Sequence, residues 1–160
     1  MSPLTFLDLP GEIRNQIYYL LLVIPRLPSS RVYLLDRDPP IYPQILSVCR
    51  KVHDEAEQIL YGSNVFVAEL NFLVGLPRLR WEYPTIKSSR LISIINKYFI
   101  AVSSLDSPAF TCVEIKDAFS GMEELTIWAV RPYLLSRYFM LRYFEGVRGV
   151  KKAKIGWVCA

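Results

Sequence analysis

The sequence has few of the residues from which catalytic and metal sites are usually built. Its 160 residues include one histidine, three cysteines and seven glycines. Cys49, Cys112 and Cys159 show no CxxC spacing, which argues against both a cysteine-rich zinc site and a disulfide framework. The GxSxG, GxxxxGK[ST] and GxGxxG motifs of hydrolases and nucleotide-binding proteins are also missing. We therefore expect no cofactor, no metal site and no catalytic residues.

Long apolar runs are missing as well. The longest, residues 17–24, stops at Pro25 and is far shorter than the roughly 20 residues that cross a bilayer. The opening residues MSPLTFLDLPGE lack the basic region and the small-residue cleavage site of a secretory signal. The sequence therefore predicts an intracellular protein, cytoplasmic or nuclear, that does not insert into a membrane.

Charge of neither sign is concentrated along the chain. The formal net charge is +4, and lysines and arginines are spread out rather than clustered, so nucleic acid is not the favoured partner. Hydrophobic residues make up 52% of the sequence, which suits one compact domain or two small subdomains. Because this content is high for a soluble domain, we expect part of the surface to contact another protein.

A first helix is predicted from Asp8 and Pro10 to Pro25. Asp8 can cap its amino end, and proline is tolerated in a first turn. Apolar residues recur at helical spacing on one face, and Tyr18 and Leu22 make the opposite side apolar too. The first face consists of Ile13, Ile17, Leu20, Leu21 and Ile24. A helix that is apolar on two sides packs between elements or offers a surface to another protein.

The single histidine lies in a second predicted helix, within ILSVCRKVHDEAEQILYGSNVF at residues 45–66. Cys49 and His53 are one turn apart on one face, where they would serve as nucleophile and base or as two metal ligands. Apolar residues at helical spacing surround Cys49, so we favour a core position for it, with His53 at the edge. The solvated face is expected to carry Asp54, Glu55 and Glu57, with ion pairs from Arg50 to Asp54 and from Lys51 to Glu55.

Short strands recur in the second half. Residues 97–102, 124–129 and 152–157 each have a strand pattern, with starts 27 and 28 residues apart, and residues 107–119 and 132–144 can form helices between them. Strands alternating with helices favour a parallel sheet. The spacing is that of long leucine-rich repeats, but a small doubly wound sheet fits equally well, and both alternatives stay open. Residues 64–69 also alternate as a strand would.

Two segments resemble the F-box-like domain that is abundant in filamentous fungi. LDLPGEIRNQIYYLLL at residues 7–22 follows the pattern LPxEIRxxIYxxLL, and residues 45–66 follow a C-R-x-[IV]-x-x-E-A core that ends in LYxxNxF. This resemblance covers most of residues 4–66 and implies a small helical module that docks an Skp1-type adaptor. A proline-rich loop replaces the middle helix of an ordinary F-box, and His53 stands at the usual tryptophan. The protein-binding residues implied are Leu9, Pro10, Ile13, Ile17, Leu20 and Leu21.

The expected fold is mixed α+β, with an F-box-like helical module at residues 1–66 packed on a small repeat-like βαβαβ region at residues 97–160. Residues 67–96 are expected to connect them, with an exposed stretch at 75–90. The expected function is non-enzymatic protein–protein interaction, in its most specific form as the subunit of a cullin-based ubiquitin ligase that recruits an unidentified protein substrate. Two alternatives are a scaffold or self-associating protein without an adaptor, and an enzyme that uses Cys49 and His53. A more remote alternative is a nucleic-acid-binding module, suggested by the recurring RYF at residues 137 and 142.

Overall fold

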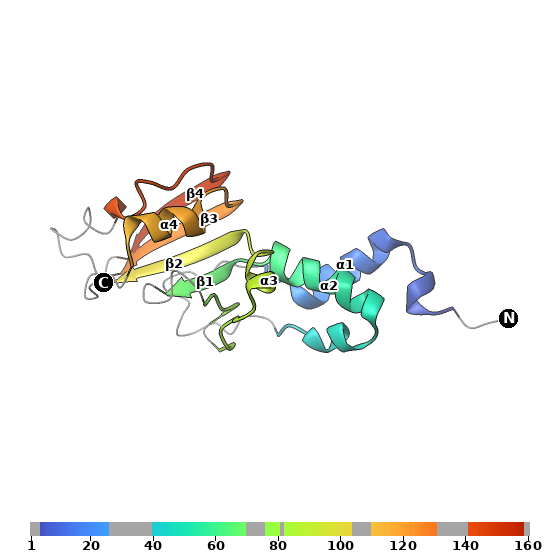
Figure 1. The fold of residues 1–160 in the computed structure, drawn as a ribbon. Coiled ribbons are helices and arrows are strands. Elements are labelled where there is room, and N and C mark those ends of the chain that lie inside the picture. The colour runs from blue at the N-terminus through green and yellow to red at the C-terminus, as the bar shows by residue number, and fades with distance from the viewer. Residues whose placement is uncertain are drawn as a thin grey trace. The chain divides into compact units, whose positions relative to one another are not determined.

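The computed structural model describes residues 4–25, 40–69, 76–80, 82–103, 110–130 and 141–158. These residues belong to two compact units, coloured from blue to red along the chain in Figure 1. The helical unit contains residues 4–25 and 40–64, and the sheet unit contains the described residues from Val65 onward. Among the described helices, none has the length and apolarity that crossing a membrane would require.

The helical unit begins with a short 3-10 helix, η1 (Phe6–Asp8), followed by α1 (Gly11–Leu22). The predicted cap of α1 is wrong in one detail. The Asp8 carboxylate accepts hydrogen bonds from the backbone nitrogen and the hydroxyl of Thr5, at 2.7 and 2.9 Å, so it closes a capping box on η1. Pro10 is the N-cap residue of α1 instead.

The second predicted helix is divided into η2 (Pro43–Ser47) and α2 (Arg50–Ser63). Cys49 separates them because it has an extended backbone, with φ −163° and ψ 168°, which is the usual conformation of an N-cap residue. Cys49 is exposed, so its predicted core position is wrong. The core side of α2 carries Val52, Ala56, Glu57 and Leu60.

Asn64 joins the end of α2 to the end of α1. Its side-chain oxygen accepts from the Ile24 backbone nitrogen at 2.9 Å, and its side-chain nitrogen donates to the carbonyls of Leu22 and Leu60 at 2.8 and 2.9 Å. The carbonyl groups in the last turn of an α-helix have no partner within the helix, and this one side chain satisfies two of them. Asn64 is fully buried, so water cannot replace it.

The sheet unit contains four parallel strands in the order β1-β2-β3-β4. They are β1 (Phe66–Glu69), β2 (Lys97–Ser103), β3 (Glu124–Val130) and β4 (Lys152–Val158). All four predicted strand positions are confirmed to within two residues. The sheet has one strand more than the predicted βαβαβ region, because residues 66–69 pair with residues 98–101. Since the strand order never reverses, the doubly wound alternative is wrong for these strands.

One face of the sheet is covered by α4 (Cys112–Phe119), which lies across the strands in Figure 1. The Phe119 ring meets Tyr98 edge-on, with ring centroids 5.2 Å apart. Thr111 and Glu114 form a capping box at the start of α4. Buried residues on this face, at alternate strand positions, are Phe66, Ala68, Tyr98, Ile100, Val102, Leu125 and Ile127. Residues 131–140, which carry most of the other predicted helix, lie outside the described residues.

The predicted connection at residues 67–96 is part of the sheet unit. It contains most of β1 and the short helix α3 (Ser89–Ile92). The expected exposure of residues 75–90 is wrong at Leu79 and Arg80, which are buried. The Arg80 guanidinium donates to the carbonyls of Val65 and Leu79 at 2.9 and 2.7 Å, which explains why a charged side chain can lie inside.

The three hydrogen bonds of Asn64 predict a clear stability defect. Replacing Asn64 by alanine leaves the Ile24 nitrogen and the Leu22 carbonyl buried without partners, which we expect to lower the free energy of unfolding by about 2–4 kcal/mol. Chemical denaturation followed by circular dichroism measures this loss. Asn15→Ala, on the exposed side of α1, is the matched control and is expected to change stability by less than about 0.5 kcal/mol. Equal effects of the two substitutions would contradict this role of Asn64.

Candidate protein-binding surface

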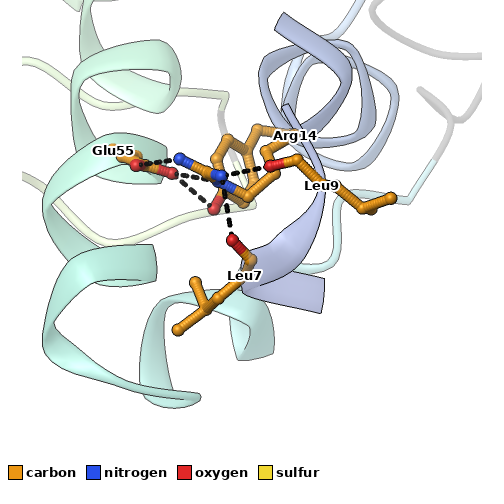
Figure 2. Close-up of polar contacts among 5 residues, drawn as sticks. Leu7, Leu9, Arg14 and Glu55 are labelled. Carbon is orange, nitrogen blue, oxygen red and sulfur yellow. Dashed lines mark hydrogen bonds and ion pairs between the residues drawn. The ribbon is translucent and has the colours of Figure 1, made fainter. Parts of the chain in front are cut away.

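The buried side of α1 is organised by an arginine. Arg14 is almost fully buried, and its guanidinium makes two hydrogen bonds to the Glu55 carboxylate of α2. The Nε–Oε2 distance is 2.9 Å and the Nη2–Oε1 distance is 2.7 Å, a bidentate arrangement that Figure 2 shows. Such paired bonds between ionised groups are stronger than neutral ones and fix the relative orientation of the two side chains.

The same guanidinium also holds the residues that precede α1. Its Nη1 atom donates to the carbonyl of Leu9 at 2.5 Å and to that of Leu7 at 3.4 Å (Figure 2). On the other side of the carboxylate, the Tyr18 hydroxyl donates to Glu55 Oε2 at 2.9 Å. Arg14 therefore connects α2, α1 and the chain before α1 in one network of hydrogen bonds.

The network shifts the titration of its members. Hydrogen bonds from Arg14 lower the pKa of Glu55 to about 2, with a smaller contribution from Tyr18. Burial raises the pKa of Tyr18 to about 12, and its hydrogen bond to Glu55 acts in the same direction. The hydrogen bonds to Glu55 also raise the pKa of Arg14. At neutral pH the ion pair is therefore fully charged and the tyrosine is neutral.

This network decides which side of α1 faces solvent. Arg14, Tyr18 and Leu22 form the buried side, and the apolar residues one quarter-turn or more away remain uncovered. Of the predicted binding residues, Ile13 is 42% exposed and Leu20 is 82% exposed. Pro10 is exposed, while Leu9, Ile17 and Leu21 are half-buried. We call Pro10, Ile13, Ile17 and Leu20 the α1 stripe.

The structure does not assemble Cys49 and His53 into a catalytic pair. His53 Nδ1 lies 2.9 Å from the Leu46 carbonyl, and Nε2 lies 3.5 Å from a carboxylate oxygen of Glu57. Both ring nitrogens therefore face groups other than the Cys49 thiol. Within the described residues, no group of three or more histidine, cysteine or acidic side chains could hold a metal ion.

The predicted solvated face of α2 is partly wrong. Glu57 is buried, and Glu55 faces Arg14 rather than forming its main ion pair with Lys51. Periodicity places all three acids on the polar side of the helix, but it gives no information about a buried arginine on another helix. Arg14 itself was missed, because a single charged residue within an apolar helix is usually solvated.

Comparison with known proteins gives no further assignment. Models of protein families, curated proteins and solved structures were searched, and none matches this chain. The F-box-like resemblance of residues 4–66 therefore remains a hypothesis that rests on the two motifs alone. The α1 stripe, by contrast, is defined by the measured exposure of its side chains.

The lowered pKa of Glu55 predicts an acid-sensitive fold. An unfolded glutamate titrates near pH 4.5, so between about pH 5 and pH 2 the unfolded chain binds a proton that the folded chain does not. The stabilisation by Glu55 is thus complete above pH 5 and is lost as the pH falls toward 2. We expect Glu55→Gln to be less stable at pH 7 and to have a flatter acid limb. Denaturation midpoints from pH 2 to pH 8 test this, and parallel acid limbs in the two proteins would contradict it.

Proposed function

We propose that this chain is a non-enzymatic interaction protein whose α1 stripe docks a partner protein. The observation that carries the proposal is the orientation of α1: a guanidinium and a phenol occupy its buried side, while isoleucine and leucine side chains are left in solvent. Each exposed aliphatic side chain gains about 1.5–3 kcal/mol when a partner covers it completely. A stripe of such residues is therefore a favourable place to bind.

The spacing of the stripe supports binding through a helix face. Ile13, Ile17 and Leu20 stand at positions i, i+4 and i+7, the spacing with which an amphipathic helix presents anchors to an apolar groove. Pro10 continues the same line at the amino end. A groove-bearing protein is thus the class of partner that the geometry favours.

The Arg14 network would make this surface rigid before binding. Its hydrogen bonds to the Leu7 and Leu9 carbonyls hold the chain before α1 in place, next to the first residues of the stripe. A surface that is already ordered loses less conformational entropy when the partner arrives. The network therefore supports binding without contacting the partner.

In its most specific form, the proposal is that the partner is an Skp1-type adaptor. The F-box-like motifs at residues 7–22 and 45–66 imply this partner and include the stripe. The chain would then act as the substrate-recruiting subunit of a cullin-based ubiquitin ligase, with the sheet unit free to bind the substrate. The competing proposal is self-association through the same stripe, favoured by the exposed Tyr19 beside Leu20.

A pull-down with a purified Skp1-type adaptor distinguishes these proposals. We expect the intact chain to bind the adaptor and Ile13→Asp with Leu20→Asp to weaken binding at least tenfold, because a carboxylate would be buried in the interface. Both side chains are exposed, so the fold should remain intact. Asn15→Asp, on the same helix and outside the stripe, is the matched control and is expected to bind like the intact chain.

Two results would contradict the adaptor proposal. One is no binding by the intact chain, and the other is equal binding by the stripe variant and the intact chain. Native mass spectrometry of the chain alone tests the competing proposal. A homo-oligomer that the Ile13 and Leu20 substitutions dissociate would assign the stripe to self-association instead.

A further inference from the structure

The two edges of the sheet differ. The outer side of β1 is partly covered, since Val67 and Arg78 exchange backbone hydrogen bonds of 2.8 and 3.0 Å in an antiparallel bridge. β4 lies at the opposite edge, and in the part of the chain that the structure describes no strand pairs with its outer side (Figure 1). An unpaired edge strand presents a row of backbone donors and acceptors that can pair with another chain.

The direction of these backbone groups follows from one hydrogen bond. The Lys152 nitrogen donates to the Glu123 carbonyl at 3.0 Å, so the backbone groups of Lys152 point toward β3. Because backbone groups of alternate residues in a strand point to opposite sides, those of Ala153, Ile155 and Trp157 point outward. β4 therefore offers three residues in the spacing that an added strand requires.

The side chains of β4 differ between the two faces of the sheet. Ala153 and Ile155 lie on the α4 face, where both are exposed and Ile155 is 56% exposed. Lys152 and Lys154 lie on the other face, in register with Glu124 and Thr126. Any strand added to this edge would thus meet apolar side chains on one face and ammonium groups on the other.

The charges on the lysine face are not balanced locally. Both ammonium groups lie near one carboxylate, that of Glu124, at 3.4 Å from Lys152 and 3.6 Å from Lys154. Their side chains remain 58% and 48% exposed, and Lys151 adds a third positive charge beside them. A second copy of β4 supplies no balancing charge, because the strand contains no acidic residue. An acidic segment supplies it directly.

We propose that β4 binds an extended acidic segment of a partner protein, which adds to the sheet as a fifth strand. The segment would alternate acidic side chains, which face Lys152 and Lys154, with apolar side chains, which cover Ala153 and Ile155. Backbone pairing with Ala153, Ile155 and Trp157 provides the register, and the lysines select the charge. This site belongs to the sheet unit and does not depend on what binds the α1 stripe.

The test uses the intact chain and a blocked, fluorescent hexapeptide in which glutamate and valine alternate. We expect fluorescence anisotropy at low salt to show binding that is at least tenfold tighter than that of the matched lysine–valine peptide. Binding should weaken as salt is added. A glutamate–valine peptide with N-methyl groups on alternate amides, in the phase that blocks pairing, should lose binding. These comparisons use the unmodified protein, so they do not depend on whether a variant folds.

Two variants locate the site. Lys152→Gln with Lys154→Gln should weaken binding of the glutamate–valine peptide about tenfold. Ile155→Pro removes an outward backbone donor and should abolish binding, while the control Ile155→Thr retains the donor and should still bind. Equal binding of the three peptides, unchanged binding by the lysine variant, or pairing of two β4 edges in a dimer of the free chain would each overturn the proposal.

Discussion

The ion pair between Arg14 and Glu55 is the interaction on which the arrangement of the helical unit depends. It satisfies a buried guanidinium, holds the chain before α1 and fixes the side of α1 that packs on α2. Removing one partner would leave the other charged and buried, which costs far more than the pair contributes. The exposed α1 stripe is a direct consequence, because a helix that is apolar on both sides can bury only one of them here.

The two units use different means to leave a surface open. In the helical unit, a polar network occupies the packing side of a helix and turns aliphatic side chains outward. In the sheet unit, the strand order β1-β2-β3-β4 leaves a seven-residue edge strand with exposed side chains. One surface is apolar and the other combines backbone groups with lysines, so they suit partners of different chemistry. Together they favour a protein that brings two others together.

The sequence alone predicts the local structure well and the packing side of α1 poorly. Alternation locates β2, β3 and β4 because each strand is short and flanked by polar residues or glycine. Helical periodicity locates α1 and α2, yet it cannot choose between two apolar sides of α1. That choice depends on Glu55, 41 residues away in the chain. Cys49 was misplaced for a related reason: periodicity continues through residue 49, while the backbone there is extended and starts a new helix.

The orientation of α1 can be measured directly with two adjacent tyrosines. Tyr18 is fully buried beside Glu55, and Tyr19 is 54% exposed on the next position of the same helix. Hydroxyl-radical footprinting of the intact chain should therefore oxidise Tyr19 and Leu20 rapidly and leave Tyr18 and Leu22 protected. Equal oxidation of the two tyrosines, or protection of Leu20 in the free chain, would contradict the claim that the Arg14 network turns the α1 stripe toward solvent.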